Sequence, residues 1–326
     1  MIKMKQFNKT NLGWLIFIAA IYGIIGAGVY LGIIDAFYEI TLITIGINII
    51  LALGLNLIIG FSGQFSLGHA GFMSIGAYCC GIMTLKMPNW TGFFAGIILG
   101  IIMASIVALI VGIPTLRLKG DYLAIATLGV SEIIRIAILN MGDLTNGAAG
   151  LSGIPMFTTW PVLFIFIVLV TIVIVNYIRS SSGRATVAIR EDEIAAESMG
   201  INTTKYKTIA FMIGAATASV GGALYASYFS VITPSDFGFM KSVDILIIVV
   251  FGGLGSITGT FIAAVVLGII NVLLQDFGAV RMIIYAVALI AIMVFKPSGL
   301  LGTKEFTISG LIAKFSKKTP TKKEEK

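Results

Sequence analysis

One uncharged stretch decides the class of fold: residues 40–85 read ITLITIGINIILALGLNLIIGFSGQFSLGHAGFMSIGAYCCGIMTL. Apart from His69, this stretch contains no acidic or basic residue. Lipid offers the backbone no hydrogen-bond partners, so such a segment crosses a membrane as helix, with about 20 apolar residues for each crossing. The stretch therefore predicts two spans, at 40–60 and 65–85, joined by the polar turn Phe61-Ser62-Gly63-Gln64.

The composition of the whole chain also indicates a membrane protein. Of 326 residues, 58% are hydrophobic and 11% are charged, whereas a soluble domain has roughly 45–50% apolar and about 25% charged residues. A soluble enzyme and a disordered chain are therefore excluded. The only cysteines, Cys79 and Cys80, are adjacent, and His69 is the single histidine, which excludes a disulfide scaffold and a histidine-based metal site. The sequence has no G-x-x-x-x-G-K-[ST] phosphate loop, so we expect no cofactor, no metal and no enzymatic ATP hydrolysis on this chain.

Further apolar runs extend this pattern along the chain. Uncharged residues cover 12–34, 87–116, 144–178, 208–235 and 245–275, and two weaker spans lie at 121–140 and 277–295. The run that ends at residue 275 is interrupted by Phe251-Gly252-Gly253-Leu254-Gly255-Ser256, so we divide it into a short segment and a full span. The sequence thus predicts an all-α polytopic membrane protein with about ten transmembrane segments, one of them short and interrupted by glycine.

Lysine and arginine set the expected orientation, because these residues are retained on the cytoplasmic side during insertion. Eighteen of the 22 basic residues fall in four segments that share one side when the amino terminus is cytoplasmic. The net charge of +7 therefore reflects membrane topology, and we expect no nucleic-acid partner. This orientation predicts a cytoplasmic amino-terminal segment 1–11, a transmembrane domain 12–297 with a cytoplasmic loop 179–208, and a basic cytoplasmic tail 298–326. The tail reaches the cytoplasm only if the interrupted run crosses twice.

The glycine interruption also predicts part of a transport path. Short hydrophobic segments broken by glycine, at corresponding positions of two halves, indicate a transport site, because irregular backbone inside a membrane lines a cavity. The spacing F-x-G-x-x-S occurs at Phe61 and again at Phe251. We therefore expect four residues of these two segments on the path: Gln64, Ser66, Gly253 and Ser256.

Three ionisable residues inside the predicted spans are further candidates for the path. His69 begins the third span, where it serves proton coupling or substrate binding, or is a neutral imidazole with a local hydrogen bond. Glu132 and Arg135 are three residues apart on one predicted helix and neutralise each other there. This pair marks the path or only fixes helix packing, since charges inside a membrane are unfavourable in either case.

The most informative polar segment is the cytoplasmic loop, which contains GRATVAIREDEIAAESMG at residues 183–200. Its alanine and glutamate content, with glycine at each end, predicts one helix. Such a helix is either solvated on all sides or suited to dock in a groove of another protein.

This loop and several other motifs resemble one known family. The motifs are Gly54-Leu55-Asn56-Leu57, Gly63 to Phe72, Leu116 to Tyr122, Thr145-Asn146-Gly147 with Gly150-Leu151-Ser152-Gly153, Gly183 to Gly200 followed by Thr203 to Lys207, and Phe251 to Ser256. Over about residues 40–300, the chain is similar to ABC importer permeases of the branched-chain amino-acid class, LivM type. The resemblance implies the fold of a type II ABC importer permease.

The resemblance also implies partners and a role for the loop. Expected partners are a second homologous permease subunit, two cytoplasmic ABC ATPase subunits that use ATP, an extracytoplasmic solute-binding protein and the lipid bilayer. The expected location is the cytoplasmic membrane of a bacterium, with both termini in the cytoplasm. In this family a helix of the loop sits in a cleft of the ATPase, which assigns the coupling role to Arg190, Glu191, Asp192, Glu193, Ala196 and Gly200.

The expected substrates are leucine, isoleucine and valine, and three alternatives stay open at this point. Related permeases import urea or nucleosides. A proton-coupled secondary transporter would use His69, Glu132 and Arg135 as its relay. A membrane scaffold that recruits a partner through the loop is the remaining alternative.

Overall fold

The computed structural model describes residues 19–28, 30–32, 35–115, 118, 120–274, 277, 287, 290, 294, 299–300 and 302. In chain order its elements are a helix Ala19–Gly28, α2 (Ala36–Asn56), the π-helix η1 (Leu57–Phe61), α3 (His69–Lys86), α4 (Trp90–Thr115), α5 (Asp121–Leu139), the 3₁₀ turns η2 (Gly142–Leu144) and η3 (Gly147–Ala149), β1 (Leu151–Ser152), α6 (Trp160–Arg179), α7 (Ser181–Glu191), α8 (Glu193–Ser198), α9 (Thr203–Phe229), β2 (Val231–Ile232), the 3₁₀ turn η4 (Pro234–Phe237), α10 (Phe239–Gly252) and α11 (Ile257–Leu273).

Five of these helices are long and apolar enough to cross a membrane: α2 with its continuation η1, α4, α5, α6 and α9. The helical fold with long apolar candidate spans is therefore confirmed. The shorter helices α10 and α11 divide the run that the sequence predicts to be interrupted, and residues 253–256 separate them. The count of about ten stays a prediction, because segment 1–11 and most of 277–295 and 298–326 lie outside the described residues.

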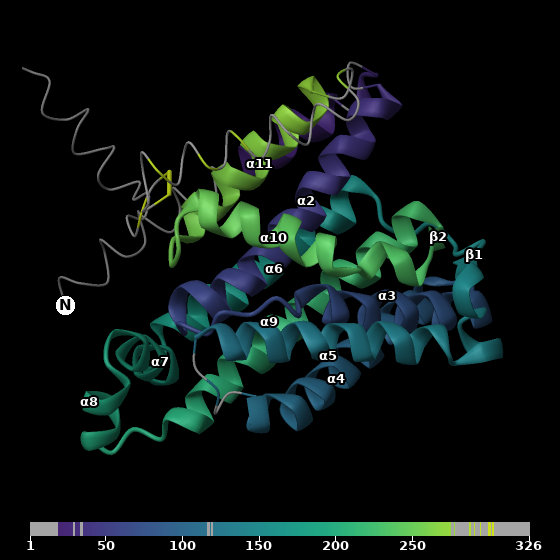
Figure 1. Ribbon diagram of the computed structural model, residues 1–326. Helices are drawn as coiled ribbons and strands as arrows, with labels where there is room; N and C mark the ends of the chain where they lie inside the picture. The colour runs from purple at the N-terminus through teal and green to yellow at the C-terminus, as the bar shows by residue number, and fades with distance from the viewer. Residues whose placement is uncertain are drawn as a thin grey trace, which may run out of the picture.

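The core is formed where α3 packs against α4 and α9 (Figure 1). Phe72 of α3 and Phe211 of α9 make an edge-to-face pair with ring centroids 5.5 Å apart. Elsewhere the backbones touch: a Cβ on Gly222 would overlap the carbonyl oxygen of Met73, and one on Gly100 would lie 3.1 Å from the Cα of Gly76. Small residues bring these helices together because lipid adds no hydrophobic force between them, so close packing stabilises the contact.

One small element departs from an all-α architecture. β1 and β2 form an antiparallel pair in which Leu151 faces Ile232 and Ser152 faces Val231. Beside this pair the Ile154 amide donates to the Ser230 carbonyl at 3.1 Å. The two strands tie the segment before α6 to the end of α9.

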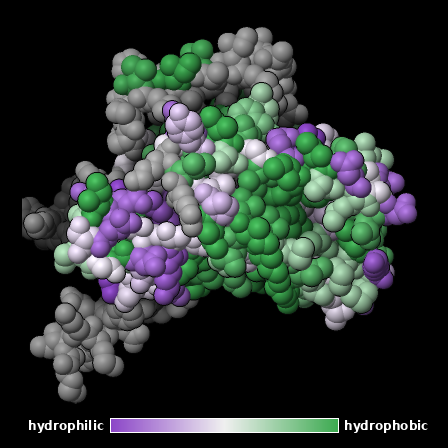
Figure 2. All heavy atoms as spheres, turned by 60° about the horizontal axis from the view of Figure 1, so that its bottom comes forward, coloured by the Kyte–Doolittle hydropathy of each residue, from purple (hydrophilic) through white to green (hydrophobic). Residues whose placement is uncertain are grey.

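The molecule has two polar ends and an apolar middle. α7 and α8 lie at one end, and β1 and β2 lie at the other (Figure 1). Figure 2 shows hydrophobic atoms across the middle of the visible face and hydrophilic atoms gathered towards both ends. The membrane-length helix α4 carries exposed apolar side chains such as Ile98 and Ile110. This distribution fits a bilayer around the middle of the bundle.

The backbone contact between α3 and α9 yields a test of the packing. Changing Gly222→Val should destabilise the protein by about 1–3 kcal/mol or more, because a side chain there meets the Met73 carbonyl. Gly23→Val is the matched control, since a Cβ at Gly23 has no neighbour within 4 Å. Thermal denaturation of the detergent-solubilised chain measures both variants. Equal melting temperatures for the two would contradict the described packing.

Candidate functional site

The α7–α8 loop, residues 180–202, is shaped by local hydrogen bonds. The Ser180 hydroxyl accepts from the Gly183 amide at 3.1 Å and caps the start of α7. Tyr177 at the end of α6 shares a 2.7 Å hydrogen bond with Thr186, which holds α7 against α6. At the far end, the Asn202 side chain accepts from the Lys205 amide at 3.0 Å and begins α9.

The prediction of a single helix between Gly183 and Gly200 is wrong, because the helix is interrupted at Asp192. Asp192 has an extended backbone, with φ −154° and ψ 108°, so it ends α7. Its carboxylate accepts from the amides of Ile194 and Ala195, both at 3.0 Å, and thereby caps α8. An aspartate favours this capping position over a helix interior, because its short side chain binds free amides at a helix start.

Because the helix breaks at Asp192, some of the six predicted coupling residues face the rest of the protein and others face solvent. Glu193 pairs with Lys207 of α9, with its carboxylate 2.6 Å from the Lys207 Nζ, and Ala196 is buried. Glu191, Asp192 and Gly200 are exposed. Gly200 lies in a turn with φ +81°, a conformation that favours glycine. The loop therefore presents only part of the predicted set to a partner.

Two exposed residues of the loop were missed by the sequence analysis. Ile194 is 75% exposed and Met199 is 83% exposed, both at the polar end of the bundle. Both are large apolar side chains on an otherwise polar loop. The available signal was two large apolar residues in an acidic segment. The signal of Ile194 was overlooked because a continuous helix places its side chain on the same face as Val187 and Ala195, where it does not stand out.

Arg190 points toward the transmembrane helices. Its Nη1 donates to the carbonyl oxygen of Gly60 in η1 at 2.6 Å. Its Nε donates to the Glu191 carboxylate at 3.1 Å, and Nη2 donates to the same carboxylate. Cβ atoms on Gly63 and Gly255 would each lie 3.0 Å from this side chain, so the arginine fills the space between the two glycine-containing turns.

The last residue of α2 and the η1 turn that follows it meet the turn before α11 and the start of α11. The Asn56 amide donates to the Ser256 carbonyl and to the Thr260 hydroxyl, each at 2.9 Å, and its oxygen accepts from the Gly255 amide at 2.9 Å. A Cβ on Gly60 would overlap both Asn56 and the Gly255 amide nitrogen. We call this arrangement of Asn56, Gly60, Gly255, Ser256 and Thr260 the helix-end junction.

The predicted path residues of the two glycine-containing segments lie in turns, and three of them form local hydrogen bonds there. Ser256 is buried and caps α11, where its hydroxyl accepts from the Gly259 amide at 3.0 Å. Gly253 is buried with φ +111°, in the turn before α11. Gln64 is buried and donates to the Ser62 hydroxyl at 2.6 Å, and Ser66 is buried and accepts from the Gly68 amide at 3.4 Å. Their role on a path stays a prediction.

His69 is buried at the start of α3. Its ring nitrogens make no hydrogen bond of ordinary geometry to the described residues. Glu132 and Arg135 form the expected pair on α5, with Nε 2.8 Å from the carboxylate. The pair is about one third exposed and is not hydrogen-bonded to His69.

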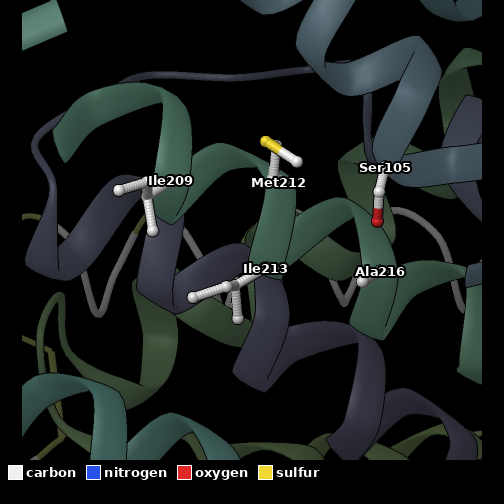
Figure 3. A pocket seen from close by; sticks show the side chains of 5 residues that line it. All are labelled: Ser105, Ile209, Met212, Ile213 and Ala216. Atoms are coloured by element: carbon white, nitrogen blue, oxygen red, sulfur yellow. The ribbon is translucent and has the colours of Figure 1, made fainter. Parts of the chain in front are cut away.

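A small hollow between α4 and α9 does not fit an amino acid. It has a volume of about 210 Å³ and is lined by Ser105, Ile209, Met212, Ile213 and Ala216 (Figure 3). A zwitterion needs partners for a carboxylate and an ammonium group, whereas this lining offers one hydroxyl and apolar side chains. None of the predicted path residues lines the hollow.

Comparison with known proteins places the chain in a family. Residues 37–295 match the branched-chain amino acid transport system permease component. The chain belongs to this family. The high-affinity branched-chain amino acid transport system permease protein LivM of Salmonella typhimurium is 36% identical over 263 residues, 69% of this chain and 62% of LivM. LivM of Escherichia coli is 35% identical over the same length, and the permease protein LivH of Escherichia coli is 36% identical over 148 residues, 45% of this chain and 47% of LivH.

This permease-family chain thus spans less than two thirds of the length of these LivM proteins. No solved structure matches it. Family membership confirms that the chain is a multi-pass membrane permease and not the ATPase of a transport system. The resemblance read from the ordered motifs is confirmed as well.

The ion pair on α5 generates a test. Replacing Glu132→Gln alone should destabilise the permease by about 1–2 kcal/mol, because Arg135 then keeps an unpaired charge on a membrane helix. The double change Glu132→Gln with Arg135→Gln should recover most of this loss. Melting temperatures of the two variants measure the difference. A double variant that is less stable than the single one would show that the two residues do not act as a pair.

Proposed function

We propose that this chain is a transmembrane subunit of an ATP-driven importer for leucine, isoleucine and valine in the cytoplasmic membrane of a bacterium. The observation that carries the proposal is the family match across residues 37–295. Its similarity to LivM and to LivH adds to this support, because both relatives are named for high-affinity branched-chain amino acid transport. The chain takes no cofactor of its own, and the partner subunits use ATP.

A second permease subunit is the first partner. The described part of the chain leaves Glu132 and Arg135 about one third exposed on α5, a helix long and apolar enough to cross a membrane. A charged pair is unfavourable against lipid and favourable against protein or a water-filled path. A homologous subunit on this side of α5 would enclose a path between the two chains. Gln64, Ser66, His69, Gly253 and Ser256 belong to the same path in our proposal.

Two ATPase subunits are the next partners, and one of them docks on the α7–α8 loop. Ile194 and Met199 supply apolar contacts that insert into a cleft, and the exposed acidic groups of Glu191 and Glu197 surround them. Apolar anchors of this kind carry most of the affinity of an interface, while charged groups around them steer association. Asp192 contributes by directing α8 outward.

The docking loop faces the cytoplasm in this proposal. Arg179, Arg184 and Lys205 lie in or beside it, as retention of basic residues requires. The opposite end, with β1 and β2, then faces outward and receives a solute-binding protein. Both chain termini are cytoplasmic in this arrangement.

A proton-coupled transporter is the weaker candidate. A relay needs a continuous line of hydrogen-bonded groups, and the His69 ring is not hydrogen-bonded to Glu132 or Arg135. Urea or a nucleoside remains the alternative cargo within an ATP-driven importer.

Docking by the loop is tested by changing its apolar anchors. We expect Ile194→Asp with Met199→Asp to abolish co-purification of the ATPase subunits when the tagged chain is expressed with its neighbouring genes. Leu144→Asp is the control, because Leu144 is also apolar and exposed but lies beyond α5 at the other end of the bundle. ATPase recovery that is unchanged in the double variant would contradict docking through these residues.

Substrate choice is tested by competition in cells that depend on this system. Uptake of labelled leucine should fall when unlabelled isoleucine or valine is added in excess, and it should be unaffected by urea or uridine. Inhibition by urea or uridine with no inhibition by valine would assign the importer to the alternative cargo.

A further inference from the structure

The carbonyl oxygen of Gly60 is an unusual anchor for an arginine. At the end of η1 the backbone amides of Ser62, Gly63 and Gln64 donate hydrogen bonds to earlier carbonyls of the same helix. Their acceptors are, respectively, Leu57, Ile59 and Ile58. The Gly60 carbonyl accepts from Arg190, 130 residues later in the chain, at 2.6 Å. A helix carboxyl end carries partial negative charge, so a guanidinium there makes a charge-assisted hydrogen bond.

Three helix ends from distant parts of the chain come together at the contact between Arg190 and Gly60. Arg190 lies in the last turn of α7, Gly60 lies in the last turn of η1, and Gly255 lies two residues before the first residue of α11. A Cβ on Gly255 would lie 3.0 Å from the Arg190 Nη1. The arginine therefore contacts both sides of the helix-end junction.

The junction itself is held tightly beneath Arg190. Asn56 joins α2 to the start of α11 through three hydrogen bonds of 2.9 Å. Backbone approaches backbone here, because a Cβ on Gly60 would overlap the Gly255 amide nitrogen. A displacement applied to either helix end is thus passed to the other, since packed elements move as rigid units.

We propose that Arg190 is a positioning residue that transmits motion of the α7–α8 loop to the paired ends of η1 and α11. Glu191 holds the guanidinium from the solvent side through Nε and Nη2, which leaves Nη1 fixed on Gly60. A movement of α7 then displaces the two helix ends together. This role differs from a contact with the ATPase, and it rests on the proposed function as a subunit of an ATP-driven importer.

The test uses the whole importer reconstituted in liposomes with its ATPases and its binding protein. Arg190→Ala should leave assembly and ATP hydrolysis near the wild-type level and lower leucine transported per ATP hydrolysed by about tenfold, as expected from the loss of one charge-assisted hydrogen bond. Arg190→Lys should recover part of the ratio, because an ammonium group also donates to a carbonyl but lacks the planar fork that Glu191 holds.

Arg184→Ala is the matched control. Arg184 is exposed on the same helix, and within the described part of the chain its side chain bonds to its own neighbourhood, to the Arg179 carbonyl at 3.0 Å and the Ser181 hydroxyl at 3.1 Å. Its transport ratio should equal that of the wild type. An unchanged ratio in Arg190→Ala, or a loss of ATPase subunits from that variant, would overturn the positioning role. Failure of the wild-type chain to recover ATPases at all would instead reject the proposed function.

Discussion

Lipid offers no hydrogen bonds to a peptide group, and this constraint governs where the chain is allowed to leave helical structure. The helices η1 and α10 end at turns that contain Gly63, Gly253 and Gly255. The freed polar groups are satisfied by side chains from elsewhere. Asn56 forms hydrogen bonds with backbone groups just before α11, and Arg190 donates to a carbonyl at the end of η1. Hydrogen bonds from distant parts of the chain therefore stabilise these helix ends.

The same hydrogen bonds connect the membrane helices to the polar loop. Each contact joins parts of the chain that are far apart in sequence: Asn56 bonds Ser256 and Thr260, and Arg190 bonds Gly60. A loop attached only by its two chain ends moves with little effect on the bundle. A loop that is also hydrogen-bonded to a helix end is able to displace it. An importer whose energy comes from subunits outside the bilayer requires such a connection.

Composition and patterning predicted the membrane class and the interruption at residues 251–256, because long uncharged runs have few alternatives. They also predicted the Glu132–Arg135 pair, since residues three apart meet on a helix. The break at Asp192 was missed, although the capping preference of aspartate was available locally. The direction of Arg190 was not predictable from local pattern, because its partner lies 130 residues away and only the folded chain brings them together. For the same reason, the burial of Ala196 and the exposure of Ile194 depend on tertiary packing.

The source of energy tests the central claim most directly. Liposomes that contain the purified complex, loaded with ATP on the side of the α7–α8 loop and supplied with binding protein outside, should accumulate labelled leucine. Accumulation should stop with a non-hydrolysable ATP analogue and persist when an ionophore collapses the proton gradient. Uptake that continues without ATP hydrolysis and disappears with the ionophore would contradict an ATP-driven importer.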